Sequence, residues 1–208
     1  MPFTTDMHDT SAPNAATPVL LAEDLSFTWP GSATACLGIN RLALNAGEHV
    51  LLLGPSGGGK STLLGLLGGV LQPTRGQVRL LGHSLSDCGA AERDRLRADH
   101  IGFIFQAFNL VPTLTAGQNI DLPLGLAGKK PDQQWRDYLV KTLGLETRLD
   151  HRPEQLSGGQ QQRVAIVRAL LARPEVVFAD EPTGNLDSNS GAEVLRLLRA
   201  AATDHAQT

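Results

Sequence analysis

The sequence predicts an α/β protein with a mostly parallel sheet, an antiparallel β region near the start of the chain and a helical region near its middle. From residue 49 onward, short apolar stretches alternate with segments of helical periodicity. That alternation is typical of a parallel sheet covered by helices on both faces. The composition agrees, because 208 residues with 41% hydrophobic and 19% charged side chains are ordinary for a globular protein with a substantial core.

Charge, cysteines and hydropathy exclude several classes of protein. A net charge of −3 gives no basic field for holding nucleic acid or anionic lipid, so no nucleic-acid partner is expected. Cys36 and Cys88 match no metal-ligand spacing and are expected to be reduced thiols. No apolar run approaches the ~20 residues that span a bilayer, and the start of the chain does not resemble a signal peptide. If the protein works at a membrane, we expect another chain to supply the spans.

The first elements follow from apolar runs and turn residues. Residues 1–18 are polar and contain proline, so we expect a disordered tail. Residues 19–50 alternate short apolar pieces with turns, which predicts antiparallel strands. The apolar run at 49–53 predicts a strand that ends at a glycine-rich turn, and a helix should follow from Lys60 to about Leu67.

Further strands and helices are predicted over the rest of the chain. Trp135, Leu139 and Leu143 recur at helical spacing, which predicts a helix between 131 and 143 with Trp135 in the core. The other predicted elements are a strand from Gln77, a polar helix at 91–98, a buried strand at 101–105, a long helix from near Ser157, a strand at 175–179 and a final helix at about 188–202.

The glycine-rich turn predicts a phosphate-binding loop. GPSGGGKST matches G-x-x-x-x-G-K-[ST] between a predicted strand and a predicted helix. Glycines let the backbone approach phosphate oxygens, and the helix N-terminus adds a partial positive charge. Lys60 would reach the β- and γ-phosphates, the Ser61 hydroxyl would ligate Mg²⁺, and Thr62 would bond an α-phosphate. The residues expected at this site are Gly54, Pro55, Ser56, Gly57, Gly58, Gly59, Lys60, Ser61 and Thr62.

Three later stretches narrow the class of nucleotide-binding protein. LSGGQQQR begins at Leu156, VVFADE ends at Glu181, and GNLD begins at Gly184. Together with the P-loop and Gln106 they resemble, in order and spacing, the motifs of the ATP-binding-cassette (ABC) family. The resemblance covers about residues 19–202. It implies a P-loop NTPase core, an ABC ATP-binding domain over 19–208 with a helical subdomain at about 107–160, and hydrolysis of MgATP.

The resemblance also implies roles for the acidic pair and the glutamine. Asp180 ends an apolar strand, where its carboxylate can hold Mg²⁺ through a water molecule. Glu181 would polarise the attacking water, and Gln106 would contact both the metal and that water. With Lys60, Glu181 and Gln106 form the predicted catalytic set.

The glycines that open the long helix predict a second phosphate contact. Ser157, Gly158, Gly159 and Gln160 offer backbone amides and a helix dipole to an anion, although an ordinary helix cap is the alternative. In the family that anion is the γ-phosphate held by a facing domain. The resemblance therefore implies a head-to-tail dimer of nucleotide-binding domains.

An aromatic residue is expected to stack on adenine. Trp29 falls where the family carries this aromatic, usually a tyrosine. Phe27 is the rival, and packing in the core accounts equally well for either residue.

The branch of the family is suggested by FIFQAFNLVPTLTAGQNIDLPL and SGGQQQRVAIVRAL. Both resemble ATPases of lipoprotein release and macrolide export, which implies an integral-membrane permease as partner and a cytoplasmic position on the inner face of the membrane. Phe108, Leu110, Val111 and Pro112 form an apolar loop that either receives a coupling helix of the permease or packs into the helical subdomain.

The sequence departs from the family pattern at its C-terminal side. The family places a switch histidine after a further strand, which lies between the P-loop strand and the strand ending in the acidic pair. His205 follows no apolar strand and is not assigned that role. Strands sit about 4.8 Å apart, so a missing strand would open a gap of about 10 Å in the sheet. We therefore expect an incomplete core of low stability.

Two alternatives to a transport ATPase remain at this point. One is a nucleotide-binding remnant with little or no hydrolysis. The other is a soluble ABC ATPase of DNA repair or translation. Repair forms insert long coiled coils between the P-loop and LSGGQ, and translation forms usually carry two cassettes and more basic charge, so both features count against that class.

Overall fold

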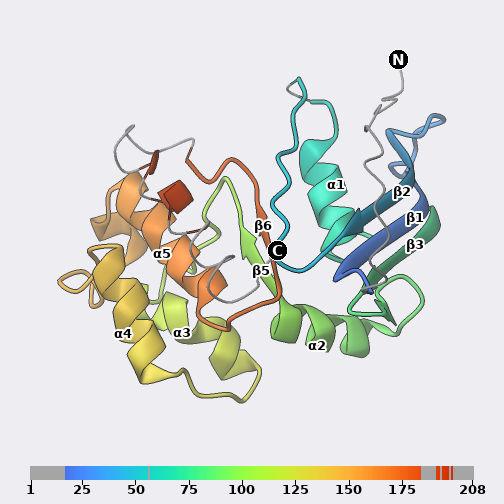
Figure 1. Cartoon of the computed structure of the whole chain (residues 1–208). Helices are drawn as coiled ribbons and strands as arrows, with labels where there is room; N and C mark the ends of the chain where they lie inside the picture. Colours follow the sequence, from blue (N-terminus) through green and yellow to red (C-terminus); the bar gives the residue numbers. More distant parts are fainter. Residues whose placement is uncertain (1–16, 56, 184–190, 193, 197, 199–208) are drawn as a thin grey trace. The chain divides into compact units, whose positions relative to one another are not determined.

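The computed structural model describes residues 17–55, 57–183, 191, 192, 194–196 and 198 (Figure 1). Nearly all of the predicted N-terminal tail lies outside these residues. The chain divides into two compact units. We call the part up to Leu96 the N-terminal unit and the part from Arg97 onward the C-terminal unit.

The N-terminal unit contains an antiparallel sheet of four strands in the order β2-β1-β3-β4. Its strands are β1 (Leu20–Phe27), β2 (Leu37–Leu44), β3 (Arg75–Leu80) and β4 (His83–Ser84). β1 is central and pairs with β2 along one edge and with β3 along the other. The antiparallel strands predicted within 19–50 and the strand predicted near Gln77 are therefore confirmed.

A bulge in the middle of β1 explains a glycine in β3. The register between β1 and β3 shifts between Glu23 and Ser26, and Asp24 has a φ of 47°. Gly76 lies opposite with a φ of 81°, and a Cβ on it would collide with the backbone carbonyl of Asp24. Only glycine fits this position without moving the neighbouring strand.

The strand predicted at His49–Leu53 is not formed, and that prediction is wrong. Residues 48–55 have neither strand nor helix conformation, and the side chains of Leu51 and Leu53 are 80% and 74% exposed. A strand requires a neighbour to pair its backbone N–H and C=O groups. Among the described residues, neither sheet includes this segment, so its apolar character alone does not make it a strand.

The helix predicted after the glycine-rich turn is confirmed as α1 (Lys60–Leu67). Its buried face carries Leu63, Leu66 and Leu67, and Gly68 ends it. The polar helix predicted at 91–98 is confirmed as α2 (Ala90–His100), and the boundary between the two units falls within it.

The C-terminal unit contains two parallel strands and the main helices (Figure 1). Its elements are β5 (Ile101–Ile104), α3 (Ala116–Leu126), α4 (Gln133–Thr142), the 3-10 helix η1 (Pro153–Gln155), α5 (Gly158–Leu170) and β6 (Val176–Ala179). The predicted strands at 101–105 and 175–179 and the predicted helices near 131–143 and from Ser157 are confirmed. Within the described residues, parallel pairing is confined to β5 and β6.

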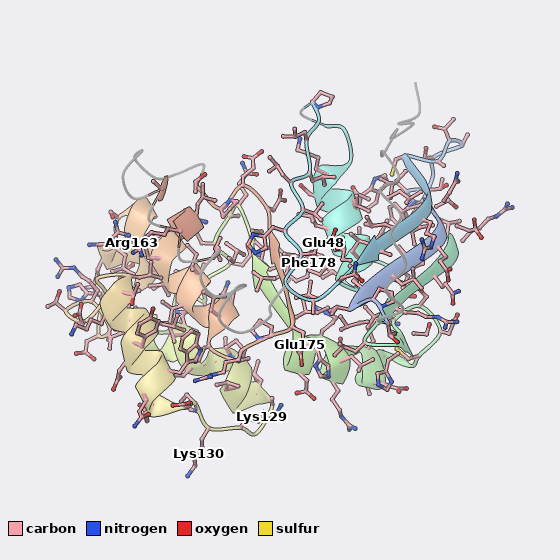
Figure 2. The ribbon with its side chains drawn as sticks, viewed as in Figure 1. Glu48, Lys129, Lys130, Arg163, Glu175 and Phe178 are labelled. Carbon is pink, nitrogen blue, oxygen red and sulfur yellow. The ribbon has the colours of Figure 1, made fainter. Side chains whose placement is uncertain are left out.

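The core of the C-terminal unit forms where α5 packs on α3, α4 and β5. Ile120, Leu139, Ile166 and Leu170 are fully buried there. Trp135 is also buried, as predicted, and its indole Nε1 donates a hydrogen bond to the Leu170 carbonyl at 3.1 Å. This bond satisfies the one polar atom of the ring and ties α4 to the end of α5. Phe178 of β6, labelled in Figure 2, is 5% exposed, and its ring centroid lies 5.2 Å from that of Phe103 in β5.

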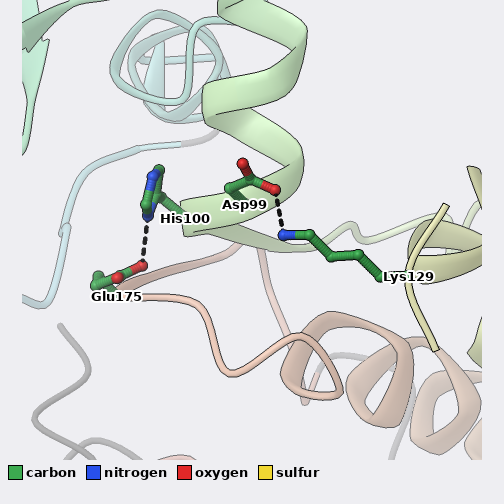
Figure 3. A network of polar contacts seen from close by, with 4 residues as sticks. All are labelled: Asp99, His100, Lys129 and Glu175. Atoms are coloured by element: carbon green, nitrogen blue, oxygen red, sulfur yellow. Dashed lines mark hydrogen bonds and ion pairs between the residues drawn. The ribbon is translucent and has the colours of Figure 1, made fainter. Parts of the chain in front are cut away.

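Two adjacent residues at the end of α2 fix where the parallel strands begin (Figure 3). The Asp99 carboxylate accepts from Lys129 Nζ at 2.6 Å, just beyond α3. His100 Nδ1 lies 2.9 Å from Glu175 Oε2, and each of these residues immediately precedes a strand. Both contacts are partly exposed, so neither is a large source of stability. The His100–Glu175 contact joins the starts of β5 and β6, and the Asp99–Lys129 contact joins α2 to the segment after α3.

The predicted final helix lies only partly within the described residues. Residues 191, 192, 194–196 and 198 are helical, and Val194 is 1% exposed within the core cluster of this unit.

Candidate functional site

The glycine-rich loop has the conformation that a phosphate cradle needs. Gly57 and Gly59 have φ angles of 75° and 83°, and the Gly58 amide donates to the Pro55 carbonyl at 3.1 Å. A Cβ on Gly57 would meet nothing within 4 Å, so glycine is required there by its backbone angle rather than by crowding. Ser56, another residue predicted to contact phosphate, lies outside the described residues.

Lys60 lies over this loop. Its Nζ donates to the carbonyl oxygens of Gly54 and Pro55, both at 3.0 Å, which places the ammonium group beside the glycine-rich turn. Lys60 is also the first residue of α1, and the first turn of that helix contains no acidic residue. The loop therefore presents positive charge, glycine backbone and a helix N-terminus together, which suits an anion.

Ser61 and Thr62 follow Lys60 in the first turn of α1. Ser61 is exposed and Thr62 is half-buried, so both lie at the end of the helix that faces the loop. Their hydroxyl groups are positioned on the same element as the Lys60 ammonium. Contacts of these hydroxyls with Mg²⁺ and phosphate remain predictions.

The two candidate aromatic residues differ in burial. Phe27 is 7% exposed, whereas Trp29 is 47% exposed. Their ring centroids lie 4.8 Å apart, with the rings nearly perpendicular. Phe27 is thus part of the core of the N-terminal unit and supports one edge of Trp29, while Trp29 retains surface for another ring to stack upon. This burial favours Trp29 as the adenine contact, which remains a prediction.

The acidic pair and the glutamine are brought together by the parallel strands. Ile104 pairs with Ala179 at the end of the β5–β6 ladder, and the Asp180 amide extends it by donating to the Ile104 carbonyl at 2.9 Å. Gln106 Nε2 donates to Glu181 Oε2 at 2.9 Å, across 75 residues of sequence. Three predicted site residues, Gln106, Asp180 and Glu181, therefore meet at the carboxyl edge of the sheet, where α/β proteins bind ligands.

Glu181, whose carboxylate accepts from Gln106, has an unusual backbone conformation. Glu181 has a φ of 49°, a left-handed conformation that is uncommon for a residue with a side chain. Among the described residues there is no group of three His, Cys, Asp or Glu side chains that would hold a metal ion. A divalent cation at this edge would consequently need amide, hydroxyl or phosphate oxygens in addition to carboxylate.

The N-terminus of α5 carries a complete capping box. Ser157 Oγ accepts from the Gln160 amide at 3.3 Å, and Gln160 Oε1 accepts from the Ser157 amide at 3.0 Å. The side chains of these two predicted phosphate contacts are thus engaged in the cap, as the alternative of an ordinary helix cap proposed. The amides of Gly158 and Gly159 lie between them, and Gly158 is exposed, so the backbone donors that an anion would use are the two glycine amides.

The apolar loop after Gln106 is half-buried. Phe108, Leu110 and Val111 are partly covered, Pro112 is exposed, and Leu110 packs against the core of the C-terminal unit. Packing into the C-terminal unit is therefore observed for Leu110, and docking of a coupling helix on this loop stays a prediction. Its shape depends on Asn119, a fully buried polar residue that sequence reasoning missed. The only sign in the sequence is that Asn119 lies next to the apolar residues Ile120 and Leu124 of the same helix.

Two further sequence assignments lie beyond what the structure describes. Gly184 to Asp187, the predicted D-loop, and His205 both fall outside the described residues. Among the described residues, no helix has the length and apolar character to cross a bilayer.

The chain resembles several bacterial ATP-binding proteins of transporters. The uncharacterised ABC transporter ATP-binding protein YbbA of Escherichia coli is 47% identical over 169 residues, which are 80% of this chain and 74% of YbbA. LolD 1, a lipoprotein-releasing system ATP-binding protein of Rhodospirillum rubrum, is 50% identical over 159 residues, 76% of this chain and 70% of LolD 1. The macrolide export ATP-binding/permease protein MacB of Marinobacter nauticus is 47% identical over 88% of this chain but only 26% of its own length.

Solved structures give the same result for the fold. The dimeric post-hydrolysis state of the ATP-binding cassette MJ0796 with ADP and Pi superposes with a TM-score of 0.84 at 37% identity, covering 91% of this chain and 85% of MJ0796.

The phosphate-binding loop, the acidic strand end and the glycine-opened helix define a P-loop ATPase with an ATP-binding cassette. Residues 38–184 match the ABC transporter family, and the chain belongs to that family. It is an ATP-binding domain of an ABC transporter and an ATPase. The alternatives of a remnant or of a soluble repair or translation ATPase are not favoured.

Proposed function

We propose that this chain binds MgATP at residues 54–62 and hydrolyses it with Glu181 to drive an integral-membrane permease of the export or lipoprotein-release type. The observation that carries the proposal is the Gln106–Glu181 hydrogen bond of 2.9 Å at the carboxyl end of β5 and β6. It holds a carboxylate and an amide at one position, where one can accept a proton from water and the other can orient that water. The names of LolD and MacB support the type of transport.

The residues of the phosphate loop fit ATP. Lys60 would contact the β- and γ-phosphates, the glycine amides would contact the phosphate oxygens, and Trp29 would stack on adenine. Ser61, Gln106 and Asp180 would supply hydroxyl, amide and carboxylate oxygens to Mg²⁺, which are the ligand types this hard cation prefers. Bound Mg²⁺ would neutralise charge that develops on the phosphates.

A head-to-tail dimer and a membrane partner complete the proposal. Gly158 and Gly159 would donate their amides to the γ-phosphate held by a second copy, and the dimeric MJ0796 cassette supports this arrangement. The chain would then lie at the inner face of the membrane, bound to its permease. The domain limits of 19–208 and the helical subdomain at about 107–160 belong to this proposal as well.

The experiment that tests the proposal is nucleotide binding by Lys60→Ala beside Lys130→Ala, measured with a fluorescent ATP analogue, with Mg²⁺ and with a chelator. Hydrogen bonds to charged groups contribute roughly 1.5–3 kcal/mol, so loss of the Lys60 ammonium should weaken binding by about 10- to 150-fold. Lys130 is exposed (Figure 2), and its replacement should have no effect. Equal affinity of the Lys60→Ala chain and the parent chain would refute the nucleotide site.

A further inference from the structure

A half-buried arginine in the last turn of α5 holds the turn that follows Gln106. Arg168 Nη1 donates to the Asn109 carbonyl and Nη2 to the Phe108 carbonyl, both at 2.6 Å. Burial lowers the pKa of the Arg168 guanidinium, yet a guanidinium remains charged in proteins. A charge that is partly removed from water is costly unless it is hydrogen-bonded, so the two carbonyl partners help to hold this half-buried side chain in place.

The turn that Arg168 holds has a strained backbone. Phe108 and Asn109 have φ angles of 59° and 50°, so two successive residues with side chains are left-handed. Such conformations persist only when surrounding contacts impose them, above all for a bulky residue such as phenylalanine. The planar fork of an arginine matches two neighbouring carbonyl oxygens, whereas a lysine ammonium is a single point of charge.

This turn also fixes the course of the chain at Gln106. The Phe108 amide donates to the Phe105 carbonyl at 3.1 Å, and the Asn109 amide donates to the Ala107 carbonyl at 2.6 Å. Gln106 lies between these two acceptors. A change in the turn would therefore move the Gln106 backbone, and with it the amide that donates to Glu181.

We propose that Arg168 is a positioning residue for hydrolysis. It holds the Phe108–Asn109 turn, which keeps the Gln106 side chain hydrogen-bonded to Glu181 and couples the position of Gln106 to that of α5. The inference rests on the proposed role of Glu181. It links α5, the helix that begins with Ser157, to the polar pair at the end of β5 and β6 through one side chain.

The far end of the same loop is held from a different helix. Asn119 of α3 accepts from the Val111 amide at 2.7 Å through Oδ1, and its Nδ2 donates to the carbonyls of Val111 and Leu114 at 3.1 and 3.2 Å. α3 in turn packs on α5. The loop from Ala107 to Leu114 is thus fixed at both ends, so a displacement imposed on it would be passed to Gln106 rather than absorbed within it.

The test compares Arg168→Met and Arg168→Lys with Arg173→Met and Arg173→Lys in the 208-residue chain. Arg173 is an exposed arginine just beyond α5 that pairs with Asp132 on the surface, so it controls for loss of an arginine near that helix. We would measure the thermal unfolding midpoint, the affinity for a fluorescent ATP analogue, kcat and KM with MgATP, and hydrogen exchange at residues 105–112.

For Arg168→Met we expect ATP affinity within about twofold of the parent, kcat lower by about tenfold or more, and faster exchange at 105–112. A small misplacement of a catalytic group can reduce a rate by about 100-fold, whereas the phosphate contacts of Lys60 are untouched. Arg168→Lys should recover part of kcat, because its ammonium can still reach one carbonyl. The Arg173 guanidinium also lies over the Trp135 ring, 4.8 Å from its centroid, so the Arg173 variants can lower the unfolding midpoint but should match the parent in ATP affinity, kcat and exchange at 105–112.

Three results would overturn the inference. One is an unchanged kcat in Arg168→Met. Another is a lower kcat without faster exchange at 105–112. The third is failure of both Arg168 variants to fold, which would make the residue purely structural. If Lys60→Ala binds ATP as tightly as the parent chain, the proposed nucleotide site is wrong. If the parent chain binds ATP but shows no turnover, the inference about Arg168 is wrong and the nucleotide site is unaffected.

Discussion

At the scale of single residues, the site depends on side chains that the chain places far apart in sequence. Gln106 and Glu181 are separated by 75 residues yet share a hydrogen bond, because β5 and β6 are parallel neighbours that end together. Both residues were predicted from the order of motifs. Their direct contact was not predictable, because it depends on the side-chain positions at the ends of two strands that are far apart in sequence.

The carboxylate of Glu181 gives the sharpest prediction at this scale. Glu181→Gln retains the size of the side chain but removes its ability to take a proton. General base catalysis contributes about 10²- to 10⁴-fold to a rate, so we expect MgATP turnover to fall by at least about 100-fold while ATP affinity stays within a few fold. Glu146→Gln, at an exposed position, is the matched control. Equal turnover in the two variants would contradict the role of Glu181.

Arg168 and Asn119 show what residue-level sequence reasoning missed. Each is a polar residue within a helix pattern, where a solvated side chain is the ordinary expectation. Their partners are backbone carbonyls of Phe108, Asn109 and Val111, and a backbone carbonyl leaves no trace in the sequence. Only the fold shows that these side chains point inward.

At the scale of elements, the start of α5 combines a cap with an anion site. Ser157→Ala should cost about 1 kcal/mol of folding stability through loss of the cap. Ser157→Asp should keep the cap but place a negative charge beside the amides of Gly158 and Gly159. We therefore expect Ser157→Asp to unfold in urea like the parent and yet to lose ATP-dependent dimerisation, measured by light scattering. Dimerisation of Ser157→Asp at parental ATP concentrations would contradict the phosphate contact at α5.

Close packing of α5 on β5 gives a prediction about stability. A Cβ on Gly102 would lie 2.6 Å from the Ala169 carbonyl oxygen, so Gly102→Ala should destabilise the protein by about 1–3 kcal/mol through overpacking. Gly125, on an exposed face of α3, has nothing within 4 Å of its Cβ position. Gly125→Ala should be neutral or stabilising by up to about 1 kcal/mol. Urea unfolding compares the two, and equal effects would show that α5 and β5 do not meet closely at Gly102.

Most helices and strands were predictable, because turn residues in this chain lie at the ends of the segments that have helical or strand-like hydrophobic periodicity. α1, α2, α4, α5 and the strands that end at Phe27, Ile104 and Ala179 lie close to where their patterns place them. α3 was not predicted as a separate helix, since Gly117, Pro123 and Gly125 weaken its pattern. Residues 49–53 failed for a different reason, because a strand depends on a neighbour that its own sequence does not encode.

At the scale of the whole molecule, the chain divides into two units that each have a sheet and a buried interior. The sequence predicted an ABC domain over 19–208 with a helical subdomain at about 107–160, which stays a prediction. The boundary between the two compact units of the structure falls within α2. Local patterns could not give this boundary, since α2 is a continuous polar helix with no buried residue. A boundary of this kind is determined by which contacts lie within each unit.

The exposed segment at 49–53 gives a prediction for the molecule as a whole. Leu51 is 80% exposed, and an exposed apolar run of this kind favours association between molecules. Leu51→Lys should therefore raise solubility and change the unfolding midpoint by no more than a surface substitution does, about 0.5 kcal/mol. Leu66→Lys, at a buried position of α1, should prevent folding. Strong destabilisation by Leu51→Lys would mean that this segment is buried in solution.

The distribution of the two tryptophans has a practical consequence. Trp29 belongs to the N-terminal unit and is 47% exposed, whereas Trp135 belongs to the C-terminal unit and is 8% exposed. Indole emission shifts to longer wavelength in water, so each unit carries one tryptophan with a different emission maximum. Trp135→Phe would leave emission from the N-terminal unit, and Trp29→Phe would leave emission from the helical interior of the C-terminal unit. Denaturation and ligand titrations can then be followed unit by unit without any attached dye.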